Sequence, residues 1–170
     1  MVGEPATLSR LARLALELDV EREALDARRE ETAELLERWE AERGLPRAEL
    51  VLVATNVHGY YTALETALER IARVVDDHVP AGPGWHAELL AQMRVEVPSL
   101  RPAVVAASIL PELHELRRFR HFFRNAYVLE LDPARVRAQA ERLVEIHPSV
   151  RKGLADLREH LDDVIRELTR

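Results

Sequence analysis

The 170-residue chain contains no cysteine, only one lysine and few aromatic residues, and it has no long apolar run. Without cysteine it cannot build a disulfide scaffold or a metal site with thiolate ligands. No stretch approaches the roughly 20 apolar residues of a membrane-spanning helix, and the N-terminus lacks the basic and then apolar pattern of an export signal. We therefore expect a soluble, cytoplasmic protein. The net charge of −6 argues against a protein that coats nucleic acid through bulk positive charge.

Strand patterns are missing as well, because β-branched residues occur singly or in pairs without alternation or Asn-Gly turns. Apolar residues instead recur at three-, four- and seven-residue steps, which is typical of amphipathic helices. The sequence predicts helices over about 7–43, 47–78, 85–95 and 103–128, and a final helical region from 133 to about 168.

Proline and glycine mark the ends of these helices. Gly44 and Pro46 end the first one, and Asp132 is the predicted N-cap of the last. Pro111 should either kink the fourth helix or start its second half, with Ser108 as a candidate cap. His147-Pro148 is expected to divide the final helical region near its middle.

The residues from His114 to Tyr127 form a cationic segment on this acidic protein. Four arginines and one glutamate give the segment +3, so the remaining chain must carry −9 to reach −6. Wound at about 100° per residue, the segment gathers apolar and aromatic side chains on one side. The opposite half carries Arg117, Arg120, Arg124, His121, His114 and Asn125, with Arg118 at one apolar border and Tyr127 at the other.

The polar half of this helix has two interpretations. Arg120 and Arg124 are one turn apart, so their guanidinium groups can converge on one phosphate, whose oxygens suit the planar donor fork of arginine. Alternatively, the arginines form a solvated face and pair with carboxylates elsewhere. Clustering favours the first interpretation, because like charges repel one another unless a partner neutralises them.

The spacing of Arg120, Asn125 and Tyr127, followed by Leu131-Asp132-Pro133, resembles the signature of the HEPN superfamily and, within it, of HepT-like toxins. The family motif is Arg-Asn, three residues, His, one residue, Tyr. The resemblance covers roughly 54–168. It implies an all-α antiparallel bundle that dimerises with the two motifs facing a shared cleft and cleaves RNA without a metal ion.

The resemblance also implies roles for individual residues. Arg120 would orient and neutralise the scissile phosphate, and the family histidine would assist proton transfer during attack by the ribose 2′-hydroxyl. Tyr127 would be the tyrosine to which the cognate nucleotidyltransferase antitoxin attaches AMP. Arg117 and Arg124 add capacity to bind phosphate or RNA.

The sequence departs from the motif at one position, because Asn125 stands where the family has histidine and His121 where it has asparagine. An amide cannot exchange a proton at neutral pH, whereas an imidazole can. Either His121 supplies the acid-base group from one turn back, or the site has lost catalysis and only binds. We favour the first reading, with Arg120, His121 and Asn125 as the catalytic set.

Other polar groups give weaker signals. His58, Thr62 and Glu65 share a helix face; we expect a partly buried histidine there, although this helix could line the same cleft. His78 lies beside Asp76 and Asp77, but adjacent helical side chains diverge, so we expect no metal site, and we expect no cofactor. The remaining histidines, His86, His147 and His160, are predicted to be surface residues or caps.

We therefore predict an all-α, HEPN-like antiparallel bundle at residues 44–170, with an amphipathic helix at 1–43 that packs on the bundle or extends it. The expected partners are RNA, a nucleotidyltransferase antitoxin and a second copy of the chain. The rival hypothesis is a catalytically inactive helical protein that binds a partner protein or RNA, with the N-terminal helix as its docking arm.

Overall fold

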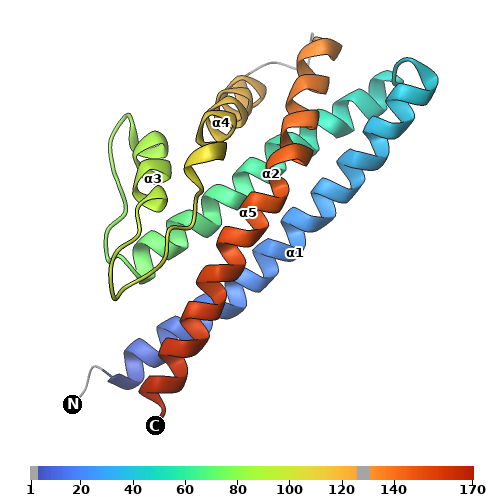
Figure 1. The fold of residues 1–170 in the computed structure, drawn as a ribbon. Helices are drawn as coiled ribbons and strands as arrows, with labels where there is room; N and C mark the ends of the chain where they lie inside the picture. Colours follow the sequence, from blue (N-terminus) through green and yellow to red (C-terminus); the bar gives the residue numbers. More distant parts are fainter. Residues whose placement is uncertain (1–3, 126–130) are drawn as a thin grey trace.

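A computed structural model of the chain describes residues 4–125 and 131–170 (Figure 1). Its elements are α1 (Glu4–Glu42), α2 (Arg47–Val74), α3 (Trp85–Arg94), a short 3-10 turn (Ala107–Ile109), α4 (Leu110–Asn125) and α5 (Pro133–Leu168). Apart from one isolated bridge between Val97 and Arg101, these residues contain no β-structure. The predicted all-α class is confirmed.

The helices α1, α2 and α5 form the long body of the molecule, and α3 and α4 cover one side of it (Figure 1). A tight turn joins α1 to α2, so these two helices run antiparallel. The central helix is α2, because it packs against all four other helices. None of the helices in the described ranges is long and apolar enough to cross a membrane.

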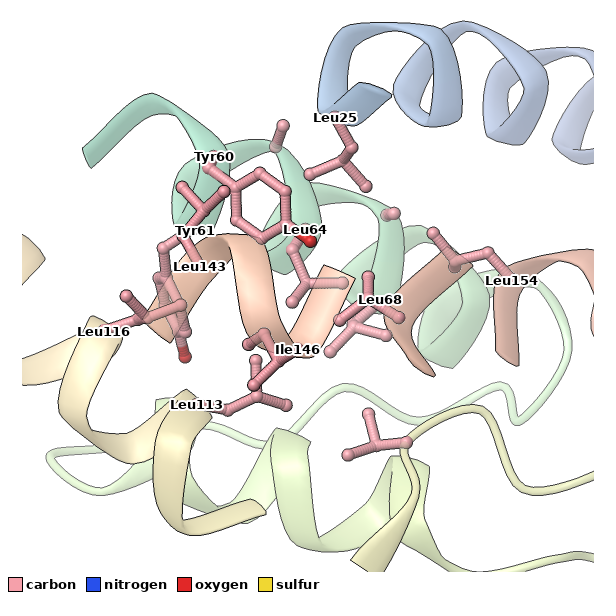
Figure 2. Close-up of a cluster of buried hydrophobic side chains, with 14 of the residues drawn as sticks. Leu25, Tyr60, Tyr61, Leu64, Leu68, Leu113, Leu116, Leu143, Ile146 and Leu154 are labelled. Atoms are coloured by element: carbon pink, nitrogen blue, oxygen red, sulfur yellow. The ribbon is translucent and has the colours of Figure 1, made fainter. Parts of the chain in front are cut away.

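The core follows the apolar stripes of the helices. Figure 2 shows Tyr60, Tyr61, Leu64 and Leu68 of α2 packed among side chains of α1, α4 and α5. The apolar stripe that the sequence predicts along α2 is buried except for its last residue, Val75, which is partly buried at the helix end. Its members are Leu50, Val53, Ala54, Val57, Tyr61, Leu64, Leu68, Ile71 and Val75. These side chains recur on one helix face, so their burial holds α2 in place through the hydrophobic effect.

The N-terminal helix α1 lies along α2 and α5 over much of its length. Leu14, Leu18, Leu25, Leu35 and Trp39 are buried in the common core. A helix that docks a partner protein would need this apolar stripe to be exposed, whereas here the stripe packs against α2 and α5 of the same chain. The exposed large apolar residues of α1 are Leu16 and Val20.

Two helix boundaries follow the predicted signals. The α1 helix ends at Glu42, and the Gly44 amide donates to the Trp39 carbonyl at 3.0 Å. At the start of α5, the Asp132 carboxylate accepts a hydrogen bond from the Ala134 amide at 3.0 Å, with proline at the first helical position. Both arrangements satisfy backbone groups that a helix end leaves without partners.

The predicted helix 103–128 was wrong at its start, since α4 begins at Leu110. The segment before it is held by tertiary contacts instead: Val104 and Val105 donate their amides to the Met93 carbonyl. Pro111 falls in the first turn of α4, where its missing N–H costs nothing. Ser108 lies in the 3-10 turn and does not cap the helix.

The predicted division at His147-Pro148 was also wrong, because α5 runs unbroken from Pro133 to Leu168. An interior proline costs a helix about 3 kcal/mol. Buried side chains on both sides of it, including Ile146, Val150 and Leu154, anchor α5 in the core. Their combined burial outweighs that local cost.

Candidate functional site

The helix α4 is oriented by three buried residues, Leu113, Leu116 and Phe119, which pack into the core. Phe122 and Phe123, expected on the same buried face, are only half-buried. The Arg135 guanidinium covers the Phe122 ring at 4.2 Å from its centroid. The apolar face of α4 is therefore narrower than the sequence predicted, and the arginines flank it closely.

Arg120, predicted on the polar half of the helix opposite the apolar side, faces α2. Its side chain is 14% exposed, and one of its terminal nitrogens lies 2.8 Å from Glu65 Oε1. The guanidinium carbon lies 5.8 Å from the centre of the Tyr61 ring, within the range of a cation–π interaction. A buried carboxylate and an aromatic ring thus fix the position of this guanidinium.

Glu65 connects three helices. Its side chain is 7% exposed and pairs through Oε1 with Arg120 on α4. Through Oε2 it contacts His86 Nδ1 on α3 at 2.6 Å. His86, predicted to be a surface residue or cap, instead supports Glu65. Both carboxylate oxygens have partners, as burial of a charged group requires.

Arg117 and Arg124 differ from Arg120 in having no carboxylate partner in the part of the chain that the structure describes. None of the ion pairs formed within residues 4–125 and 131–170 involves either guanidinium. Arg124 is exposed, and the buried Nε of Arg117 has no hydrogen-bond partner among the described residues. Arg118, at the predicted border, is 62% exposed and pairs with Glu115 one turn earlier. No carboxylate within 4–125 or 131–170 therefore pairs with the guanidinium groups of Arg117 and Arg124, on either side of Arg120.

His58 joins this group from α2. It lies one turn before Tyr61 on the same helix face, and its ring centre is 5.4 Å from that of Phe123. Burial lowers the pKa of His58, and Arg120 and then Arg124 lower it further through their positive charges. The sequence placed His58 and Glu65 on one face of α2 but could not show that this face meets α4.

The other predicted site residues lie on the outer side or at the end of α4. His121 is exposed, and Asn125 is the last helical residue. Tyr127, the predicted modification site, lies outside the described residues. On the preceding turns, burial lowers the pKa of His114, as do Arg117 and Arg118. The structure therefore brings Arg120 and Arg124 near an imidazole, but that imidazole belongs to His58.

A second polar cluster lies where α1, α2 and α5 meet. The Tyr60 hydroxyl is 3.1 Å from His147 Nδ1, and His147 Nε2 is 3.0 Å from Asp26 Oδ1. His147 was predicted at the surface but is buried, and burial lowers its pKa despite the nearby carboxylate. Tyr60 is fully buried and its pKa is raised, so it stays protonated. We read this cluster as a structural link between the three helices.

An open groove of about 620 Å³ borders the second cluster and is lined from α1 and α5 by Asp26, Arg29, Glu30, His147, Pro148, Arg151, Lys152 and Ala155. It contains none of the α4 arginines. Its charges are mixed, and Arg151 and Lys152 already pair with aspartates. The groove therefore lacks the excess of positive charge that distinguishes α4.

Two further residues singled out in the sequence, His160 and Asp76, have structural roles. His160 Nε2 contacts the Leu100 carbonyl at 2.9 Å. Asp76 binds the buried Arg101 guanidinium through both oxygens, at 2.6 and 2.8 Å, which anchors the loop between α3 and α4. No group of three potential ligands in the described ranges is arranged to hold a metal ion.

Comparison with known proteins gives one match. A family model described as HepT-like protein matches residues 52–161, well over half of the chain. The matched range contains α3, α4 and most of α2 and α5, and so every described residue of the site around α4. No curated protein and no solved structure matches the chain.

Proposed function

Because the chain belongs to the HepT-like family, we propose that it is a HepT-type toxin that cleaves RNA without a metal ion. The observation that supports this best is that Arg117 and Arg124, on either side of Arg120, have no carboxylate partner among the residues that the structure describes. Unpaired guanidinium groups on an otherwise acidic protein repel one another until an anion binds. A phosphodiester backbone supplies such anions in series.

In the proposed mechanism, Arg120 is the phosphate ligand. Its contacts with Glu65 and Tyr61 hold the guanidinium in one orientation, so little reorganisation is needed when negative charge develops on the phosphorus. Arg117 and Arg124 bind neighbouring phosphate oxygens. His121 exchanges a proton with the reacting oxygens, and Asn125 orients the substrate through its amide.

The active form is proposed to be a homodimer in which two copies of residues 117–127 face a shared cleft. One helix presents its arginines to only one side of a phosphodiester, whereas two facing helices can enclose it. Light scattering should give a dimer at micromolar concentration, and a monomer under those conditions would contradict this part of the proposal.

Regulation is proposed to act through Tyr127, with AMP attached by a cognate nucleotidyltransferase antitoxin. The added phosphate and nucleoside would occupy the cleft and pair with the same arginines that bind RNA. A small nucleotidyltransferase encoded beside the gene would support this. Co-expression of the two proteins, followed by mass spectrometry, should show one AMP on Tyr127 and none in a Tyr127→Phe variant.

The alternative function is binding of RNA or a partner protein without cleavage. It is favoured by one observation, that Asn125 occupies the position of the family histidine. An amide at that position can hold a substrate but cannot exchange its proton.

The decisive experiment measures cleavage of labelled RNA in excess EDTA. Arg120→Ala should lower the rate by about 10²-fold or more, as is typical when a group that stabilises transition-state charge is removed. Arg118→Ala is the matched control, since Arg118 is on the same helix but exposed and paired with Glu115. Circular dichroism should show that both variants fold. Equal rates for the two variants would contradict the assignment of Arg120, and RNA binding without cleavage by the wild type would favour the alternative.

A further inference from the structure

Metal-free cleavage of RNA requires two proton transfers. The 2′-hydroxyl must lose a proton as its oxygen attacks phosphorus, and the departing 5′-oxygen must gain one. Within the motif on α4, His121 is the only side chain whose ordinary pKa allows exchange near neutral pH, because Asn125 has replaced the family histidine. The proposed function therefore assigns a residue to only one of the two proton transfers.

The α2 helix places an imidazole beside the same arginines. His58, Tyr61 and Glu65 recur at three- and four-residue steps, so they share one face of α2. Along this face, Glu65 pairs with Arg120, Tyr61 lies under its guanidinium, and His58 contacts the ring of Phe123. The half-buried His58 thus lies on the same face of α2 as Tyr61 and Glu65, one turn before Tyr61.

The charges around His58 favour its neutral form. Burial disfavours the imidazolium ion, and the positive charges of Arg120 and Arg124 disfavour it further, so the pKa of His58 lies below the ordinary histidine value. A neutral imidazole can accept a proton at neutral pH. A bound phosphodiester would offset the two guanidinium charges, so proton acceptance becomes easier once substrate is present.

Resting on the proposed ribonuclease function, we propose that His58 is the general base that removes the proton from the ribose 2′-hydroxyl. The freed 2′-oxygen forms a bond to phosphorus, and the bond between phosphorus and the 5′-oxygen breaks. The 5′-oxygen takes a proton from His121 or water. The products are a 2′,3′-cyclic phosphate and a 5′-hydroxyl, and His58 later returns its proton to water.

The neighbouring elements carry few groups that could reverse this charge balance. Among the described residues, the charged or titratable groups next to this part of α2 are Arg117, Arg120 and Arg124 on α4, Asp26, Arg28 and Glu31 on α1, and His147 on α5. Arg28 lies over Gly59, and Glu31 accepts a hydrogen bond from Asn56. His147 contacts Tyr60, which points about 200° away from His58 around α2.

The first test compares His58→Gln with His114→Gln in the RNA cleavage assay. His114 is the matched control because burial and two arginines lower its pKa as well, but its arginines are Arg117 and Arg118. His58→Gln should lower the cleavage rate by about 10²-fold while RNA affinity stays within about threefold, as expected for loss of a general base. It should also remove the acid-side decline of kcat/KM that protonation of His58 causes, which should lie below the ordinary histidine pKa of about 6.5 because the pKa of His58 is lowered. His114→Gln should retain both the rate and that decline.

The second test uses NMR on the wild-type protein, so it does not depend on folding of a variant. The His58 ring should titrate below the ordinary value in the free protein. Its pKa should rise on addition of an RNA analogue that lacks the reacting 2′-hydroxyl and is not cleaved. A pKa of His58 that does not change when the analogue is added would overturn the assignment.

The outcomes separate this inference from the proposed function. Wild-type cleavage with an unchanged rate and pH profile in His58→Gln would overturn the role of His58 and leave the ribonuclease function standing. Absence of cleavage by the wild type, with RNA still bound, would overturn both.

Discussion

Replacing Glu65 tests the central contact of the site, because one buried carboxylate supports both Arg120 and His86. Glu65→Gln keeps the size of the side chain but removes its charge, and it replaces one of the two oxygens that contact Arg120 and His86 by an NH2 group. Glu65→Ala removes both contacts and leaves a cavity. We expect the free energy of unfolding to fall for both variants, and further for alanine.

The size of the effect follows from burial. Removing one partner of a fully buried ion pair typically costs about 3–5 kcal/mol. Arg120 and His86 keep 14% and 29% of their side-chain exposure, so water partly compensates each of them when Glu65 is lost. We therefore expect a loss of about 1–2 kcal/mol for Glu65→Gln and about 2–4 kcal/mol for Glu65→Ala.

Urea unfolding followed by circular dichroism measures this difference. The matched control is Glu69→Gln, one turn later on α2, where the glutamate pairs with an Arg73 that is 61% exposed. Such surface pairs contribute at most about 1 kcal/mol, so the control should unfold near the wild-type midpoint. If Glu65→Gln and Glu69→Gln shift the midpoint equally, the carboxylate does not anchor Arg120 as argued.

The RNA assay adds a second readout for Glu65→Gln. Loss of the negative charge beside Arg120 should strengthen RNA binding, since the phosphate no longer competes with a carboxylate. Loss of the fixed orientation should slow cleavage. A variant that binds more tightly and cleaves more slowly supports Glu65 as a positioning residue, whereas parallel loss of both properties would indicate a general loss of structure.

Two further predictions concern stability. A Cβ at Gly153 would lie 1.9 Å from the Val104 carbonyl oxygen. Gly153→Ala should therefore lower the free energy of unfolding by about 2 kcal/mol or more. An unchanged urea midpoint would show that the loop before α4 does not pack against α5 as described. His147 has a lowered pKa in the folded protein. Unfolding therefore takes up a proton, so stability should fall as pH drops below the ordinary histidine value of about 6.5. His147→Gln should weaken this dependence, and an equally steep curve in the variant would contradict the assignment.

Local signals in the sequence predicted much of the fold. The α2 stripe and the Asp132 cap depend on residues within a few positions of one another, and periodicity records such relations directly. The start of α4 and the continuity of α5 through Pro148 do not depend on neighbouring residues in this way. Contacts with other parts of the fold determine both. Tertiary packing overrides local preference at these two places.

The candidate site shows the same limit. Helical periodicity in the sequence located the cationic segment, but it placed Arg117, Arg120 and Arg124 together on one polar face. The structure separates Arg120, which pairs with Glu65, from Arg117 and Arg124, which have no such partner in the described ranges. That distinction depends on where α2 lies relative to α4, and helical periodicity carries no information about it.

The helix α1 precedes the range of the family match, yet it helps to position the site. The Arg28 side chain of α1 lies against α2 at Gly59, where a Cβ would lie 2.7 Å from Arg28 Nε, so a larger residue there would require Arg28 to shift. This contact lies directly beside His58 in the sequence, two residues before Tyr61 and six before Glu65. Because α2 carries those residues on one side and contacts α1 on another, a shift of α1 would move the whole α2 face against α4. The orientation of Arg120 therefore depends on packing between α1 and α2 as well as on its own contact with Glu65.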